Sequence, residues 1–199
     1  MRTLFFLFLV LSLNSYSQTA EDYFYSGISK TNLKDWKGAI VDFTKAIALY
    51  PEYTNAYYNR GWLKQELQDY TGAIADYTNA IALNPENLDA YVGRGSAKFE
   101  LQDYTGAIAD ITKAITLDPL DANNYSNRGF AKAKLQDYTG AIADYDKAIA
   151  LNPEFADAYY NRGNSKYSHI DFTGACRDWS RAGELGIAEA FEMRKKYCQ

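Results

Sequence analysis

The sequence predicts an all-α protein built as a solenoid of antiparallel helix pairs. The block LQDYTGAIAD occurs three times without change, at 67–76, 101–110 and 135–144, so its copies start 34 residues apart. One short unit repeated at a fixed period is the signature of a stacked array. Glycine and proline keep the same step along the chain, at Gly27, Gly61, Gly95, Gly129 and Gly163 and at Pro51, Pro85, Pro119 and Pro153.

The repeat divides the chain into five units followed by a short end segment. The units span 20–53, 54–87, 88–121, 122–155 and 156–189, and positions are numbered below from the first residue of each unit. The segment 190–199 is predicted to form a C-terminal capping helix and tail, with its helix starting near Ile187, that covers the last apolar face.

Each unit is predicted to contain two helices, which in the second unit run from about 55 to 67 and from about 70 to 83. Asp69 can cap the later helix because its carboxylate accepts from free amides of the first turn. Asn84-Pro85 ends that helix, since proline disfavours a helical residue before it. Glycine inside a helix costs about 1 kcal/mol relative to alanine. Gly61 is therefore expected to permit a close crossing against Ala73 of the second helix.

The N-terminal residues 1–17 are predicted to be a signal peptide. A short positive start precedes the apolar run 4–13, and small residues stand at the −3 and −1 positions of a cut between Ser17 and Gln18. A membrane anchor is the alternative, but the run is shorter than the roughly 20 residues that span a bilayer. We expect an exported protein, periplasmic or secreted, with no integral membrane segment after cleavage.

The repeat resembles the tetratricopeptide repeat family. In the second unit the resemblance rests on an aromatic at position 4, glycine at 8, alanine at 20, an aromatic at 24, alanine at 27 and proline at 32: Tyr57, Gly61, Ala73, Tyr77, Ala80 and Pro85. It implies a right-handed superhelix whose concave groove receives an extended peptide or a helix from a partner protein. Two departures stand out: Ile111 replaces the position-24 aromatic, and 182–186 looks similar to a Sel1-type repeat ending.

A third departure from the family concerns charge. Arg60 and Lys64 flank Gly61 where the family usually has leucine and tyrosine, and Asp76 stands beside the core aromatic of the second helix. Buried charges persist when they are paired, so we predict a ladder of ion pairs between the two helices of each unit. A basic stripe for an acidic ligand is the alternative.

Comparing the copies with one another locates a candidate ligand groove. The second helices are nearly identical, whereas the first helices differ at positions 5, 9 and 12, which share one helical stripe. Drift at solvent-facing positions is the alternative explanation, but large aromatic residues recur there, and exposed apolar patches mark contact sites. The predicted groove residues are Asn55, Tyr58, Trp62, Gln65, Asp89, Ser96, Phe99, Asn123, Phe130, Tyr160, Asn164 and Tyr167.

The composition argues against catalysis and against nucleic-acid binding. The chain has one histidine, His169, at a predicted turn, so a histidine-based triad or a multi-histidine metal site lacks its residues. A net charge of −4 disfavours a nucleic-acid partner, which requires a clustered basic face. We expect no enzymatic activity, metal or cofactor. The two cysteines, Cys176 and Cys198, are predicted to form a disulfide that fixes the cap, with two free thiols as the alternative.

The sequence therefore predicts an exported, non-enzymatic scaffold that binds a protein or peptide. Two alternatives remain open at this level. Aromatic faces with Asn and Asp side chains also suit an envelope glycan or cell-wall fragment, and the unusual regularity of the units also suits a structural, self-associating module.

Overall fold

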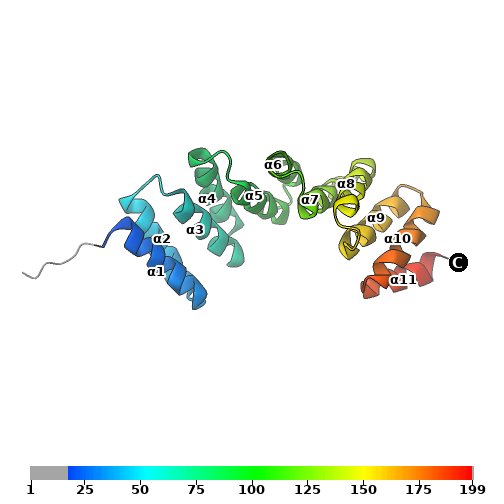
Figure 1. Ribbon diagram of the computed structural model, residues 1–199, viewed down its shortest axis with the longest axis horizontal. Coiled ribbons are helices and arrows are strands. Elements are labelled where there is room, and N and C mark those ends of the chain that lie inside the picture. The colour runs from blue at the N-terminus through cyan, green and yellow to red at the C-terminus, as the bar shows by residue number, and fades with distance from the viewer. Residues whose placement is uncertain (1–17, 199) are drawn as a thin grey trace, which may run out of the picture.

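The computed structural model describes residues 18–198, and the predicted signal peptide lies outside that range. Within it the chain forms eleven α-helices and no strand, which confirms the all-α fold class (Figure 1). The helices are α1 (Ala20–Asn32), α2 (Trp36–Leu49), α3 (Thr54–Glu66), α4 (Tyr70–Leu83), α5 (Leu88–Glu100), α6 (Tyr104–Leu117), α7 (Ala122–Lys134), α8 (Tyr138–Leu151), α9 (Ala156–Ser168), α10 (Phe172–Glu184) and α11 (Ala188–Tyr197).

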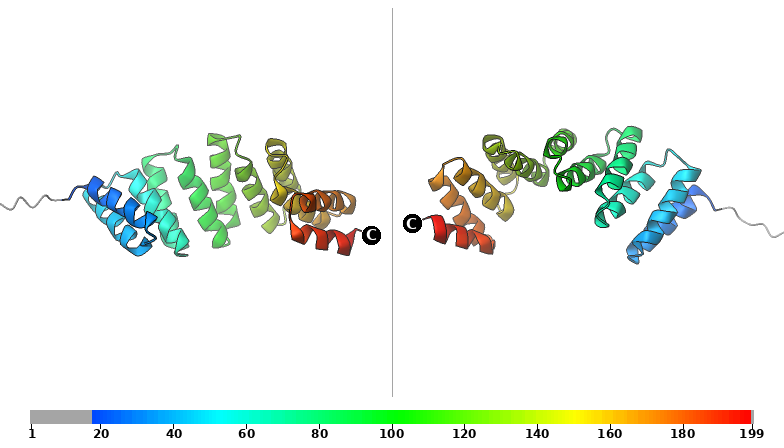
Figure 2. Two further views of the ribbon diagram at one scale, coloured as in Figure 1. Left: turned by 60° about the horizontal axis from the view of Figure 1, so that its bottom comes forward. Right: turned by 180° about the vertical axis from the view of Figure 1, so that it is seen from behind.

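The helices pair in chain order and the pairs form an arch. Each odd-numbered helix from α1 to α9 packs against the next even-numbered helix. In the middle of the arch the first helices α3, α5 and α7 lie nearer its inner side than α4, α6 and α8 (Figure 1). α3 also contacts α5 directly, and α7 contacts α9. The helices α1 and α11 lie at opposite ends in every view (Figure 2). The inner surface is therefore built mainly from the first helices, whose sequences differ most between units.

The turn inside each unit is stabilised by a hydrogen bond between the repeated aspartate, which caps the second helix, and the glycine three residues later. In the second unit the Asp69 carboxylate accepts from the Gly72 amide at 3.0 Å, which confirms the predicted N-cap. A Cβ added at Gly72 would overlap that carboxylate, so the cap requires glycine there. Gln68, one residue before the cap, takes a left-handed φ of 63°. The same carboxylate-to-amide bond recurs in all five units.

The position-8 glycines allow close packing of the two helices, although the partner differs in part from the prediction. A Cβ on Gly61 would lie 3.2 Å from the Tyr77 ring and 3.3 Å from the Asp76 Cβ, so the aromatic at position 24, not Ala73, is its nearest neighbour. In the fourth unit the Ala141 carbonyl oxygen does approach, at 3.1 Å from a Cβ on Gly129. The large ring occupies the space that glycine leaves free.

The predicted ion-pair ladder is present. Asp76 is 2% exposed and receives the Arg60 Nη2 at 2.6 Å and the Lys64 Nζ at 2.7 Å. The third, fourth and fifth units repeat this arrangement around Asp110, Asp144 and Asp178. Because these arginines and lysines are held by buried carboxylates, they do not form a free basic stripe for an acidic ligand.

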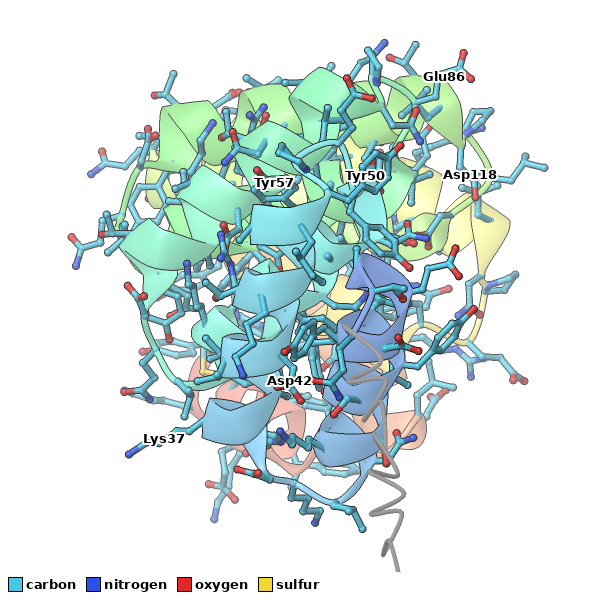
Figure 3. The ribbon with its side chains drawn as sticks, turned by 90° about the vertical axis from the view of Figure 1, so that its left-hand side faces the viewer. Lys37, Asp42, Tyr50, Tyr57, Glu86 and Asp118 are labelled. Atoms are coloured by element: carbon cyan, nitrogen blue, oxygen red, sulfur yellow. A yellow bond between two sulfur atoms is a disulfide. The ribbon has the colours of Figure 1, made fainter. Side chains whose placement is uncertain are left out.

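In the first unit the buried aspartate pairs with a lysine and a serine, where the other units have a lysine and an arginine. Asp42 lies between α1 and α2 (Figure 3) and contacts Lys30 and Ser26, each at 2.6 Å. Burial acts to raise the pKa of Asp42, but the hydrogen bonds from Lys30 and Ser26 and the charge of Lys30 outweigh it. The pKa of this carboxyl therefore lies below its ordinary value, and Asp42 is ionised at neutral pH.

The two ends of the array are closed in different ways. At the positions where α3 buries Ala56 and Leu63, α1 carries the polar residues Asp22 and Ser29. At the other end α11 packs on α10, and a disulfide joins Cys176 to Cys198 with Cα atoms 5.8 Å apart. No helix among residues 18–198 has the length and apolar character needed to cross a membrane.

Candidate functional site on the inner face

The varied positions of neighbouring first helices meet on the inner face. The Gln65 Nε2 lies 3.4 Å from the Ser96 Oγ. The Phe99 and Phe130 rings stack with their centroids 5.2 Å apart and an interplanar angle of 24°. In both contacts position 12 of one unit meets position 9 of the next. The predicted stripe is therefore continuous from α3 to α7. We call the residues at positions 5, 9 and 12 of α3, α5 and α7, together with their neighbours at positions 2 and 13, the inner stripe.

The larger pocket of the inner stripe lies between α5 and α7 and has a volume of about 220 Å³. Its apolar walls are Val92, Phe99, Ile111 and Phe130, and Glu100 stands among its lining residues. Ile111 occupies the place of a ring, because Tyr77 and Tyr145 stand at the same position in the second and fourth units. The smaller Ile111 side chain leaves room for the pocket. The sequence shows isoleucine in place of the aromatic residue at position 24, but the pocket that results was not predicted from it.

A smaller pocket of about 110 Å³ lies between α7 and α9 and shares Phe130 as a wall. Tyr145 lines it, and the Tyr145 hydroxyl is buried without a hydrogen-bond partner. In the second unit the equivalent Tyr77 hydroxyl donates to the Gln65 Oε1 at 3.2 Å. The fourth unit has Ala133 in place of that glutamine, so the hydroxyl lacks its acceptor. Burial, with a contribution from the charge of Asp144, raises the pKa of Tyr145.

The N-terminal part of the stripe is more open. Trp62 is 37% exposed, and the Tyr58 ring packs against Tyr77 with centroids 6.0 Å apart. Asn55 and Asp89 are exposed on the same helix faces. Burial raises the pKa of Tyr58, and the charge of Asp89 adds to the shift.

Several predicted groove residues at the C-terminal end pack against α10 and α11. Tyr167 lies against Tyr197 of α11, with ring centroids 4.7 Å apart, and against Phe172 at 5.2 Å. Asn164 accepts from the Trp179 Nε1 at 3.0 Å, and Tyr160 packs in the same cluster. Tyr167 therefore supports the capping helix, because α11 occupies the place where a sixth unit would begin.

Asn123 lies apart from the pockets. It is exposed at the start of α7, where its Nδ2 donates to the Asp121 Oδ1 at 2.9 Å. This contact belongs to the N-terminal end of the helix and leaves the Asn123 side chain outside both pockets.

The charge of the inner stripe is acidic toward its N-terminal half. Glu66, Asp89 and Glu100 are exposed, and none of them takes part in an ion pair within residues 18–198. Lys134 is the basic residue of the stripe, with its Nζ 5.0 Å from the centroid of the Phe130 ring. Sequence reasoning did not select Glu66, Glu100 or Lys134, although their common position 13 repeats with changing charge.

A wider and more open hollow of about 560 Å³ lies beside the disulfide, away from the inner stripe. Its residues include Arg177 and Arg181, and Arg181 pairs with Glu184 at 3.0 Å. His169 lies at the end of α9, as the predicted turn residue. Across residues 18–198, no three His, Cys, Asp or Glu side chains gather in a way that could hold a metal ion.

The geometry defines a helical-repeat protein with an aromatic, acidic inner surface. Known repeat patterns match most of the array: "Tetratricopeptide repeat" matches residues 23–53 and 58–122, and "TPR repeat" matches residues 131–169. The chain belongs to the tetratricopeptide repeat family.

Solved structures share the fold over most of their length. MamA is 24% identical with a TM-score of 0.80, covering 90% of this chain and 96% of that chain. YrrB, described as a TPR protein with an unusual peptide-binding site, is 20% identical with a TM-score of 0.81, covering 88% and 92%. MamA from Desulfovibrio magneticus RS-1 is 19% identical with a TM-score of 0.81, covering 85% and 96%. No curated protein matches the sequence. At these identities the likenesses establish the fold.

Proposed function

We propose that the protein is an exported, non-enzymatic scaffold that binds an extended segment of a partner protein along the inner stripe. The observation that carries this proposal is the Phe99–Phe130 stack beside an apolar pocket on the inner face. Phe130 is 38% exposed, although the fold could place a polar residue at that position, as it does with Ser96. Aromatic residues exposed next to a pocket are typical anchors of binding surfaces.

Three further features support a peptide or protein ligand. The pockets follow one another along the arch, which suits a chain that places successive side chains into them. YrrB shares the fold and is described as having a peptide-binding site. The two ends of the array are closed by polar residues and by α11, which disfavours end-to-end self-association as the main function.

The proposal is tested by selecting peptides from a random displayed library on the purified protein. The affinity of each selected peptide is then measured by fluorescence anisotropy. Trp62→Ala and Phe130→Ala should each weaken binding by about tenfold or more, since buried aromatic anchors carry much of a binding free energy. Tyr50→Ala is the matched control, because Tyr50 is an exposed aromatic at the end of α2 and outside the stripe. Undiminished binding by both stripe variants, or binding of glycans but of no peptide, would overturn the proposal.

Export is the second part of the proposal. The disulfide between Cys176 and Cys198 supports it, because structural disulfides persist in oxidising compartments outside the cytoplasm. The intact mass of the protein recovered from fractionated cells tests it. We expect an envelope or medium fraction containing a chain that begins at Gln18, whereas a full-length chain confined to the cytoplasm would contradict export.

A further inference from the structure

We infer that the inner stripe selects peptides in which a large apolar residue lies beside a lysine or arginine, and that Tyr145 donates a hydrogen bond to the bound segment. This inference rests on the proposed function and deepens it, because it states the chemistry of the partner segment. It is carried by three independent features: the pocket between α5 and α7, the Glu100 carboxylate in its lining, which forms no ion pair within residues 18–198, and the unpartnered hydroxyl in the adjoining pocket.

The size and lining of the larger pocket suit one apolar side chain. Its volume of about 220 Å³ lies below the roughly 300–1,000 Å³ typical of pockets for drug-sized molecules. Val92, Phe99, Ile111 and Phe130 give it apolar walls from three helices, α5, α6 and α7. An aromatic or long aliphatic side chain entering it would gain burial and ring contacts against the Phe99–Phe130 stack.

The charge around this pocket favours a basic neighbour. Glu100 lines the pocket, and Glu66 stands at the same position of the preceding unit. Asp89 adds a third exposed carboxylate at the start of α5. The lysines at position 11, such as Lys98, are held by the buried aspartates and do not neutralise these groups. Lys134 is the one cation of the inner stripe, with its Nζ 5.0 Å from the centroid of the Phe130 ring, and the three carboxylates outnumber it. Charge complementarity therefore favours a cationic side chain next to the apolar anchor, on the Glu100 side of the pocket.

The Tyr145 hydroxyl supplies a third recognition element. Tyr145 is fully buried and its hydroxyl lacks a partner, while it lines the pocket that adjoins Phe130. A buried hydroxyl left unpaired is unfavourable, so a ligand that provides an acceptor gains from satisfying it. A backbone carbonyl of an extended segment is such an acceptor, either directly or through one ordered water.

The experiment compares the peptides selected on the wild-type protein with those selected on Glu100→Lys. The wild-type selection should be enriched in an apolar residue with lysine or arginine within about two positions. In binding assays Glu100→Lys should weaken the enriched peptide about fivefold and should strengthen the matched peptide whose basic residue is replaced by glutamate. A merely structural effect of the substitution would weaken both peptides alike. Thermal unfolding of Glu100→Lys checks that this exposed substitution leaves the fold intact.

Tyr145→Phe tests the hydroxyl separately. This variant keeps the ring, so the fold should be retained or made slightly more resistant to heat, because an unsatisfied buried group is removed. Its affinity for the enriched peptide should fall about fivefold. Unchanged affinity in Tyr145→Phe would remove the hydroxyl from the inference.

The outcomes separate this inference from the proposed function. If peptides bind and Phe130→Ala weakens them, but neither the apolar–basic pattern nor the exchange of preference by Glu100→Lys appears, this inference fails while the proposed function stands. If no peptide binds, or if the stripe variants bind normally, the proposed function fails and this inference fails with it.

Discussion

Arg94 on α5 holds Asp110 on α6 through two hydrogen bonds, from Nε to Oδ2 at 2.9 Å and from Nη2 to Oδ1 at 2.7 Å. The same guanidinium reaches the preceding unit, where its Nη1 lies 3.1 Å from the Thr78 Oγ1. Lys98 contacts the same carboxylate at 2.8 Å. One arginine therefore joins the two helices of its own unit and also fastens that unit to its neighbour.

Arg94→Ala should lower the free energy of unfolding by about 3 kcal/mol, because it removes the main partner of a buried carboxylate and the link to Thr78. Lys98→Ala should cost less, since the arginine keeps both of its bonds to Asp110. Urea denaturation followed by circular dichroism measures both values. Equal costs for the two variants would show that Arg94 has no special role.

Gly106→Ala should destabilise the protein by about 1 kcal/mol, although alanine is the better helix former. The reason is that a Cβ at this position would displace the Asp103 carboxylate, which accepts from the Gly106 amide at 2.9 Å. In the Asp103→Ala background the cap is already lost, and the same substitution should become neutral or stabilising. A double-mutant cycle measured by urea denaturation tests this coupling. Additive effects would contradict the account.

Asn124→Ala should stabilise the protein by about 1 kcal/mol. Asn124 is a buried residue of α7, 1% exposed, and its Nδ2 has no hydrogen-bond partner within residues 18–198. An unsatisfied buried amide costs about 1–3 kcal/mol, part of which the smaller side chain would lose again in packing. Alanine occupies the same position in other units, at Ala56, Ala90 and Ala158.

The matched control for Asn124→Ala is the reverse exchange in a neighbouring unit, Ala90→Asn, which should destabilise. Differential scanning calorimetry compares both variants with the wild type. A lower melting temperature for Asn124→Ala would show that the amide makes a favourable interaction.

Reduction of the disulfide should loosen the C-terminal cap while leaving the rest of the array folded. A bond closing a loop of this kind contributes about 2–3 kcal/mol, and here it joins α10 to the end of α11 across a separation of 22 residues. Because units in a solenoid contact mainly their neighbours, the loss should concentrate in α10 and α11. Hydrogen exchange with and without reductant measures this. A Cys176→Ala/Cys198→Ala variant should show no further response to reductant, and an even loss of protection over all units would contradict a local role.

Most of the fold could be predicted from the sequence because the residues that cap, cross and pair the helices recur at the same positions in successive units. Asp69 at the helix start, Gly61 at the crossing and the Arg60–Asp76 pair are each readable from local spacing and charge. The role of Gly72 was not predicted, because it depends on where the Asp69 carboxylate lies in space. The candidate site was predicted only in outline. The pocket beside Ile111 exists because isoleucine replaces the larger aromatic residue at position 24. The Tyr145 hydroxyl lacks a partner because Ala133 replaces the glutamine that accepts from the equivalent Tyr77.

The C-terminal end of the predicted stripe shows a further limit. Tyr167 has the same position in its unit as Phe99, yet α11 packs against it and turns it into a support for the cap. The sequence predicted this helix but carried no direct indication of which side chains it would contact.

The central claim is that ligands bind where the first helices differ, along the inner stripe. Photo-crosslinking tests it most directly, with a selected peptide whose apolar residue is replaced by a photoreactive phenylalanine analogue and with the attachment sites mapped by mass spectrometry. The account predicts attachment to residues of α5 and α7 around Phe130, reduced by excess unmodified peptide. Attachment instead to the repeated outer surfaces of the second helices, or to the hollow beside the disulfide, would contradict it.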